Sequence, residues 1–117
     1  MNRKTETRPW GKFEQFTHNE LSTVKILTVL PGKRLSLQSH QHRQEIWIAL
    51  DDGSIAEIDG KKTILKARDQ ITIPQGAKHR LSSAPTTSTP IRVLEISFGA
   101  FDEQDFIRYE DDFGRVN

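Results

Sequence analysis

The stretch "SLQSHQHRQEIW" (residues 36–47) carries the side chains from which the fold and the chemistry of this chain can be worked out. Alternate side chains of a β-strand share a face, so Gln38, His40 and His42 are expected to point the same way. If the chain reverses near residues 41–44, Glu45 returns beside His40. The pattern therefore predicts a polar cluster at the mouth of a β-hairpin.

Length and composition limit the kind of protein that this cluster belongs to. A chain of 117 residues suits one domain, and we expect a single domain over residues 1–117. Its 17 basic and 16 acidic residues nearly balance, which argues against nucleic acid or an anionic membrane as partner and favours a small polar molecule. There is no cysteine, no signal-like N-terminus and no apolar run of membrane-spanning length, so a cytoplasmic location is the expectation.

The rest of the chain shows a period of two in short runs that end at turn residues. Residues 82–90 have the Ser, Thr and Pro content of a loop, and one helical turn is expected within residues 102–113. Short strands with frequent turns are typical of an all-β jelly-roll β-sandwich or barrel. The expected strands are "VKILTVL" (24–30), "IAEI" (55–58), "QITIP" (70–74) and "IRVLEIS" (91–97).

A second stretch, "IPQGAKHRL" (residues 73–81), adds His79 at the start of another strand, after a turn shaped by Pro74 and Gly76. Two hairpins would then bring together a mixed nitrogen and oxygen set. Such a set suits one divalent ion, of zinc, cobalt, manganese or iron. The expected metal ligands are Gln38, His40, Glu45 and His79; His18, in the polar "THNE" (17–20), is expected to be an ordinary surface residue.

The joint spacing of these residues resembles the two signature motifs of the cupin superfamily. The first motif runs from Gly32 through Gln38-x-His40 to Glu45, with glutamine in place of the usual first histidine. The second is Pro74-x-Gly76-x-x-His79. The resemblance implies a cupin double-stranded β-helix whose metal ligands come from these motif positions.

Five ordered blocks narrow the resemblance to the type II phosphomannose isomerase (mannose-6-phosphate isomerase) domain. The resemblance implies metal-dependent interconversion of mannose 6-phosphate and fructose 6-phosphate. In that family the domain often follows a nucleotidyltransferase that makes GDP-mannose, for which this chain has no room, so it resembles the isomerase domain alone. The blocks are "RPWGKF" (8–13), "VKILTVLPGKRLSLQSHQHRQEIW" (24–47), "IPQGAKHRL" (73–81), "VLEISFG" (93–99) and "DFIRYEDDFGR" (105–115).

The chain departs from that family at two positions. Ile46 stands where the family usually has histidine, and Asp52 stands where a glycine normally ends the strand, with Gly53 one place later. If the family's histidine helps catalysis, the chain would keep a metal-binding fold with altered activity. A non-catalytic or regulatory cupin that binds a sugar phosphate or sugar nucleotide is therefore the alternative to an isomerase.

Isomerisation of an aldose to a ketose needs a group that moves a proton and a group that holds charge on oxygen. His42 is the first candidate for the proton carrier, and Glu95 in the strand 91–97 is the second; Arg43 completes the expected catalytic group. A substrate phosphate calls for cations, several of which flank the ligand stretches. The expected phosphate-binding residues are Arg43, Arg80 and Arg115, in preference to Lys33, Arg34 and Arg108.

Alternation along the hairpin also predicts an apolar outer face. If the ligands point inward, large aliphatic side chains point outward and need cover. The N-terminal segment through Trp10 and Phe13 can supply it within the chain, or a second copy can supply it in a homodimer. The expected outward residues are Leu35, Leu37, Ile46, Ile48 and Leu50.

Overall fold

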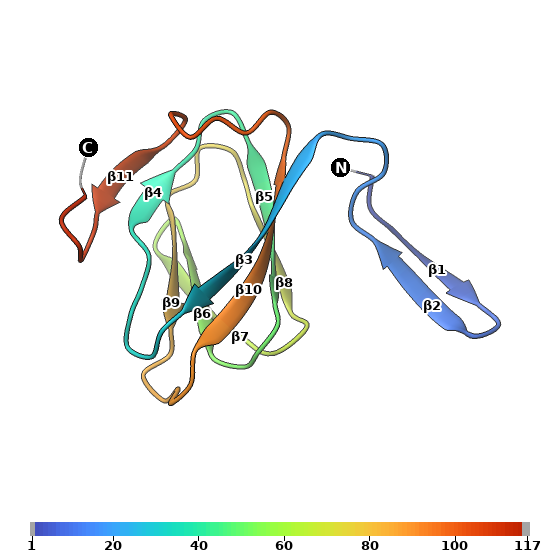
Figure 1. Cartoon of the computed structure of the whole chain (residues 1–117), viewed down its shortest axis with the longest axis horizontal. Helices are drawn as coiled ribbons and strands as arrows, with labels where there is room; N and C mark the ends of the chain where they lie inside the picture. Colours follow the sequence, from blue (N-terminus) through green and yellow to red (C-terminus); the bar gives the residue numbers. More distant parts are fainter. Residues whose placement is uncertain (1, 116–117) are drawn as a thin grey trace.

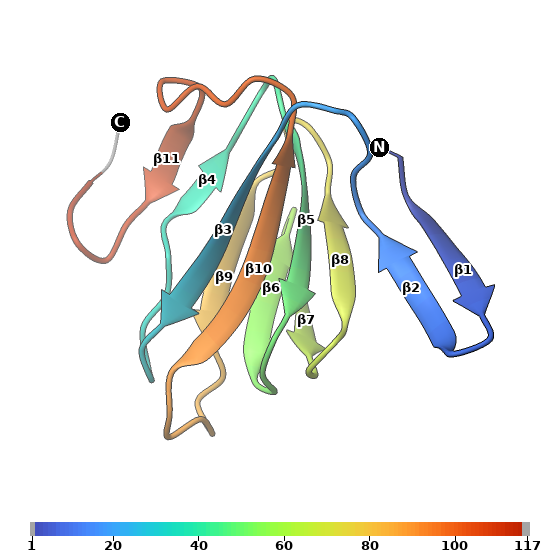
Figure 2. The same ribbon diagram turned by 45° about the vertical axis from the view of Figure 1, so that its right-hand side comes forward.

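The regular elements of the described residues are all strands, arranged as two facing sheets and a separate N-terminal hairpin (Figure 1, Figure 2). The structure, a computed structural model, describes residues 2–115. One sheet has the order β3-β10-β5-β8, with β3 (Ser22–Val29), β5 (Gln44–Ala49), β8 (Gln70–Ile73) and β10 (Ile91–Phe98). The other has the order β11-β4-β9-β6-β7, with β4 (Leu37–Ser39), β6 (Ser54–Ile58), β7 (Lys61–Leu65), β9 (His79–Ser83) and β11 (Ile107–Glu110).

The predicted all-β sandwich is confirmed, and β3, β6, β8 and β10 cover the four strands expected from the sequence. The expected helical turn within residues 102–113 is wrong, because β11 forms there and pairs with β4. Tyr109 on β11 also has its hydroxyl 2.9 Å from the hydroxyl of Ser39. None of the elements found between residues 2 and 115 is a helix that could cross a membrane.

The inner faces of the two sheets enclose the main core. Residues paired across neighbouring strands share a face, so each register row projects as a set. One such row joins Lys25, Glu95 and Trp47, and the Trp47 side chain is 1% exposed. Apolar side chains from both sheets fill the space around Trp47: Val29, Ala49, Ala56, Leu65, Ile73, Ala77, Leu81, Ile91 and Val93.

The outer face of the four-stranded sheet carries a second, smaller cluster. Ile46 and Ile48 lie there with Ile96 and Phe98, and Phe16 packs against them. Leu35 does not join this face as predicted. It packs against the main core, because it precedes β4 of the other sheet and its backbone N–H donates to the carbonyl of Leu81 over 2.9 Å. Strand alternation therefore does not extend from the residues before β4 into β5.

The N-terminal hairpin of β1 (Lys4–Arg8) and β2 (Gly11–Gln15) stands beside the sandwich (Figure 2). Arg68 donates to Glu14 over 2.8 Å, which ties the hairpin to the segment before β8. Trp10 is 73% exposed, so it does not cover the outer cluster as expected. Phe16, just after β2, provides part of the cover, while Val24 and Ile26 on β3 remain 56% and 58% exposed.

The position of the glycine after β5, at residue 53 instead of residue 52, has a steric explanation. Gly53 has φ +101°, and a Cβ atom there would lie 2.4 Å from Cγ2 of Thr87. The turn therefore requires glycine at position 53. Asp52 makes its own contact, since its carboxylate accepts a hydrogen bond from the backbone N–H of Ala67 over 2.8 Å. The departure at Asp52 is accommodated by this local turn.

Burial predicts that substitution by alanine lowers the free energy of unfolding far more at one leucine than at another. Leu81 is fully buried and Leu21 is 66% exposed. Leu81→Ala should lower the free energy of unfolding by about 2–5 kcal/mol, because it leaves a cavity in the main core. Leu21→Ala should change it by about 0.5 kcal/mol or less. Chemical denaturation followed by tryptophan fluorescence measures both, and equal losses would contradict the description of the core.

Candidate metal centre

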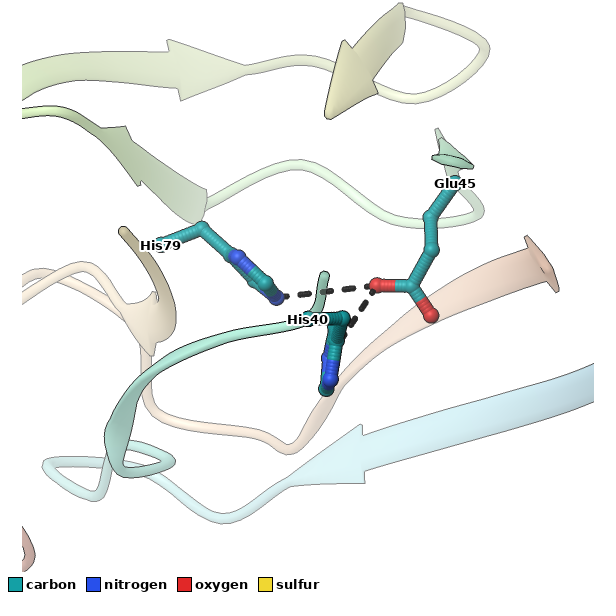
Figure 3. A group of neighbouring side chains, drawn as sticks. All are labelled: His40, Glu45 and His79. Carbon is teal, nitrogen blue, oxygen red and sulfur yellow. Dashed lines mark ion pairs between the residues drawn. The ribbon is translucent and has the colours of Figure 1, made fainter. Parts of the chain in front are cut away.

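Three side chains from separate strands converge at one end of the sandwich (Figure 3). His40 directly follows β4, Glu45 lies near the start of β5, and His79 begins β9. Glu45 Oε1 lies 3.6 Å from His40 Nε2 and 3.5 Å from His79 Nε2. All three side chains are buried, with at most 5% of the residue exposed.

Hydrogen bonds on the far side of each ring fix both histidines. His40 Nδ1 donates to the carbonyl of Asp105 over 3.0 Å, and His79 Nδ1 donates to the carbonyl of Ala77 over 3.0 Å. In the neutral tautomer that these bonds favour, each Nε2 carries a lone pair toward Glu45. Histidine ligands of metals are held in this way.

Two atoms of the cluster have no hydrogen-bond partner among the described residues, although they are buried. They are Glu45 Oε1 and His79 Nε2. The other carboxylate oxygen of Glu45 accepts a hydrogen bond from the hydroxyl of Ser97 over 2.6 Å. Buried acceptors without a donor cost folding free energy, and their convergence indicates a site for a cation.

The geometry of the three ligand atoms fits a divalent ion. Their mutual distances are within 4.8 Å. Tetrahedral ligands at about 2.1 Å from zinc lie roughly 3.4 Å apart, close to the separation between Glu45 and each histidine. Two imidazoles and a carboxylate also suit manganese, iron and cobalt.

Arg43 already brings one positive charge to the cluster. Its side chain is 6% exposed, and its Nε lies 3.6 Å from Glu45 Oε2. Its terminal nitrogen Nη2 lies 3.2 Å from His40 Nε2, the atom that a metal would use. An ion bound at all three ligands therefore requires Nη2 to move away from His40.

Burial shifts the pKa of every member of the cluster toward its neutral form. It lowers the pKa of His40 to about 4, with the positive charge of Arg43 adding to the effect. It also lowers the pKa of His79 and raises that of the Glu45 carboxyl. Both imidazoles are consequently neutral at pH 7, the form in which histidine binds a metal.

Glu95, on β10, is the carboxyl group next to the cluster. Its Oε2 accepts a hydrogen bond from the indole N–H of Trp47 over 3.0 Å. Burial, followed by the negative charge of Glu45, raises the pKa of Glu95. A carboxylate whose pKa is raised in this way is a stronger base than an ordinary carboxylate, which suits it to taking and returning a proton.

The remaining expected residues divide into those near the cluster and those away from it. Gln38 pairs in register with His79, so their side chains share a face, and Gln38 lines the cavity beside the cluster. His42 is exposed, and the prediction that it shares a strand face with His40 is wrong. β4 ends at Ser39 and residues 41–42 form a bend, so alternation is lost before His42.

Two of the arginines expected to bind phosphate have protein partners. Arg80 is buried, donates through Nε to the carbonyl of Leu35 over 2.9 Å, and lies 3.5 Å from the carboxylate of Glu110. Arg115 donates to the carboxylate of Asp111 over 2.8 Å. These contacts hold the C-terminal segment, and neither arginine lines the cavity beside the cluster.

Sequence reasoning missed several residues around the site: Lys25, Ser97, Phe101, Asp105 and Phe106. Of these, Ser97 carried a signal, since alternation in β10 places it on the face of Glu95 and its register partner is Glu45. The phenylalanines lie in the connection between β10 and β11, whose path no local pattern predicts. Lys25 lies on β3, at an edge of its sheet, which no local sequence pattern predicts.

Ile46 lies on the opposite face of β5 from Glu45. It is fully buried in the outer cluster with Ile48 and Ile96. A histidine at position 46 would start from that outer face. The isoleucine therefore removes no side chain from the His40–Glu45–His79 cluster.

Comparison with known proteins gives the sequence a family. Residues 1–111 match the family described as Mannose-6-phosphate isomerase C-terminal. The chain is 37% identical over 110 residues to the mannose-1-phosphate guanylyltransferase ManC of Salmonella typhimurium. The aligned region covers 93% of this chain and 22% of that protein. The chain thus spans about a fifth of the length of such curated relatives.

Solved structures agree on the fold. A cupin protein from Bacteroides fragilis superimposes with a TM-score of 0.60 at 28% identity, over 69% of this chain and 70% of that one. The capsular polysaccharide assembling protein CapF from Staphylococcus aureus gives a TM-score of 0.70 at 14% identity, over 92% of this chain and 34% of that one. The cupin fold expected from the motifs is confirmed.

The lowered pKa of His40 predicts acid sensitivity of the metal-free protein. An unfolded histidine binds a proton below its ordinary value of 6.5, whereas folded His40 does so only near 4. With respect to His40, the free energy of unfolding is therefore highest above pH 6.5 and decreases as the pH falls toward 4, by at most on the order of 3 kcal/mol. The raised pKa values of Glu45 and Glu95 act in the opposite direction.

A comparison of variants isolates the contribution of His40. In the presence of a chelator, we expect the free energy of unfolding of His40→Gln to fall less between pH 7 and pH 5 than that of the wild type. The matched control variant is His18→Gln, at an exposed histidine. An unchanged pH dependence in His40→Gln would contradict the assignment.

Proposed function

This chain belongs to the mannose-6-phosphate isomerase C-terminal family, and on that premise we propose that it interconverts mannose 6-phosphate and fructose 6-phosphate. The observation that carries the proposal is the His40–Glu45–His79 cluster, which lies beside Glu95. Two of its buried ligand atoms have no hydrogen-bond partner among residues 2–115. Metal ligands next to a proton carrier are what aldose–ketose isomerisation needs.

In this proposal His40, Glu45 and His79 hold one divalent ion, and Gln38 is the fourth candidate ligand, from the face of His79. Such an ion, when bound, supplies Lewis-acid polarisation of the carbonyl and hydroxyl oxygens of the sugar. Arg43 remains the nearest protein cation and offsets negative charge that develops on those oxygens.

Glu95 carries the proton. Its carboxylate takes the proton from C2 of mannose 6-phosphate, the C–H electron pair forms the C1–C2 double bond, and the C1 carbonyl oxygen gains a proton to give an enediol. Return of a proton to C1, with loss of the C2 hydroxyl proton, gives fructose 6-phosphate. The hydrogen bond from Trp47 holds one carboxylate oxygen of Glu95 in place. His42 is too exposed for this role.

A second candidate is a cupin that binds a sugar phosphate or sugar nucleotide without turnover. It is favoured by the contact of Arg43 Nη2 with His40 Nε2, which gives this histidine nitrogen a hydrogen-bond partner without a metal. Ile46 does not support this alternative, because it lies on the outer face of the sheet.

An assay of fructose 6-phosphate formation tests the proposed reaction. Metal-loaded wild-type protein should convert mannose 6-phosphate, and removal of metal by chelation should abolish the activity. The double variant His40→Ala, His79→Ala should lose both bound metal, measured by elemental analysis, and activity, while His18→Ala keeps both. A metal-loaded wild type that binds the sugar phosphate without turnover would favour the second candidate.

Two further variants separate the candidates for the proton carrier. Glu95→Gln keeps the shape of the side chain and should lower kcat by about 10²- to 10⁴-fold with the metal content unchanged. His42→Ala should retain wild-type kcat. The reverse result would return the role to His42.

We also propose that the protein is a homodimer that covers the remaining apolar surface of the four-stranded sheet. Val24 and Ile26 on the edge strand β3 are more than half exposed, next to the buried outer cluster. Trp10 at the end of the N-terminal hairpin is 73% exposed and offers a matching apolar group. A second copy that packs on this face buries all three side chains at once.

Light scattering at micromolar concentration should give twice the mass of the chain. Ile26→Glu places a charge on the proposed interface and should shift the protein toward monomer without unfolding it, because Ile26 is already 58% exposed. Ile64→Glu, at another exposed isoleucine (67%) on β7, is the matched control and should leave the mass unchanged. A monomeric wild type, or equal effects of the two variants, would refute the dimer.

A further inference from the structure

A cavity of about 460 Å³ opens beside the metal-ligand cluster, between the edge strands of the two sheets. β3 ends the four-stranded sheet and β11 ends the five-stranded one. Both edges contribute to the lining together with the connection between β10 and β11. The lining residues are Lys25, Gln38, Arg43, Phe101, Glu103, Gln104, Phe106 and Arg108.

Three cations of this cavity lie on aromatic rings. Lys25 Nζ and the guanidinium carbon of Arg43 each lie 4.2 Å from the centroid of Phe101. The guanidinium carbon of Arg108 lies 4.2 Å from the centroid of Phe106. The rings hold the long side chains in the wall of the cavity, and Lys25 and Arg108 keep their N–H groups available, whereas Arg43 also contacts His40 and Glu45.

Arg108 differs from most arginines of residues 2–115 in having no carboxylate within ion-pair distance, and Lys25, like most lysines of that range, has none either. Between residues 2 and 115, no ion pair is found for either side chain. By contrast, Arg34 pairs with Asp112, and Arg80 with Glu110. Unpaired cations that face one cavity attract an anion.

We propose that Lys25 and Arg108, assisted by Arg43, bind the phosphate group of the sugar phosphate. The cavity then holds two cations without an ion pair among residues 2–115, Lys25 and Arg108, together with Arg43, which also pairs with Glu45, and one lining carboxylate, Glu103. Its amide groups on Gln38 and Gln104 can donate further hydrogen bonds. The assignment of the anion to a sugar phosphate rests on the proposed function; the attraction of an anion does not.

The position of Arg43 links the anion site to the reaction centre. One side of its guanidinium contacts His40 and Glu45, and the other lies on Phe101, which Lys25 also contacts. A phosphate held by Lys25 and Arg108 therefore leaves the sugar between the anion site and the cluster. Phosphate binding would in this way position the carbonyl end of the sugar near Glu95.

Binding measurements on the full-length, metal-loaded protein test the assignment. Calorimetry should show that Lys25→Gln and Arg108→Gln each weaken binding of mannose 6-phosphate by about 10- to 100-fold, as expected for loss of a charged hydrogen bond. Binding of mannose, which lacks the phosphate, should change less than about twofold. Inorganic phosphate should compete with mannose 6-phosphate in the wild type.

A matched lysine controls for a general loss of charge. Lys78 also lies on an aromatic ring, 4.4 Å from the centroid of Tyr109, but it does not line the cavity. Lys78→Gln should bind mannose 6-phosphate like the wild type. Circular dichroism and thermal denaturation of all three variants confirm that the fold is retained.

The binding results can fail for the anion site and for the proposed reaction in different ways. Wild-type affinity in Lys25→Gln and Arg108→Gln overturns the inference, even if the protein is an active isomerase. The same holds if the wild type binds mannose 6-phosphate no more tightly than mannose. Phosphate-dependent binding that both substitutions weaken, without formation of fructose 6-phosphate, supports the anion site and removes the isomerase proposal.

Discussion

The buried carboxylate of Glu45 is the constraint around which the functional end of this molecule is organised. A carboxylate that is 1% exposed costs free energy unless cations or donors surround it. Ser97 donates to one of its oxygens and Arg43 lies nearby, yet the other oxygen faces two histidines that are themselves neutral. Among the described residues, one oxygen of Glu45 therefore has no hydrogen-bond donor, and a bound cation would supply the missing interaction.

The two-sheet topology places this cluster at one end of the sandwich, directly beside the apolar core, where the ring centroids of Trp47 and His79 lie 5.7 Å apart. Cross-strand registers carry Lys25, Glu95 and Trp47 across one inner face, and Arg108, Gln38 and His79 across the other. The rows begin with cations at the sheet edges and pass through the fully buried side chains of Trp47 and His79 in the interior. Stability is therefore concentrated around Leu81 and Trp47, which leaves the edges free to meet polar ligands.

Prediction from sequence succeeded where the chain repeats a local pattern. Alternating apolar residues and turn signals identified the principal strands, and the motif spacing identified His40, Glu45 and His79 as neighbours before the sheets were known. It failed where tertiary contacts decide. The bend at residues 41–42 turns His42 to solvent. Arg80 and Arg115 lie within ion-pair distance of Glu110 and Asp111, and their expected role in phosphate binding stays a prediction.

The alternation of β5 also explains how the chain can differ from its family without losing the candidate site. Glu45 and Trp47 face inward, where they contact His79 and Glu95, while Ile46 packs outward against Ile96. Because neighbouring residues of a strand point to opposite faces, a change at position 46 alters the outer apolar layer and any surface that packs on it. The chemistry of the inner face depends instead on Arg43, which contacts both the cluster and the wall of the cavity and so joins the ligand atoms to the cations at the sheet edges.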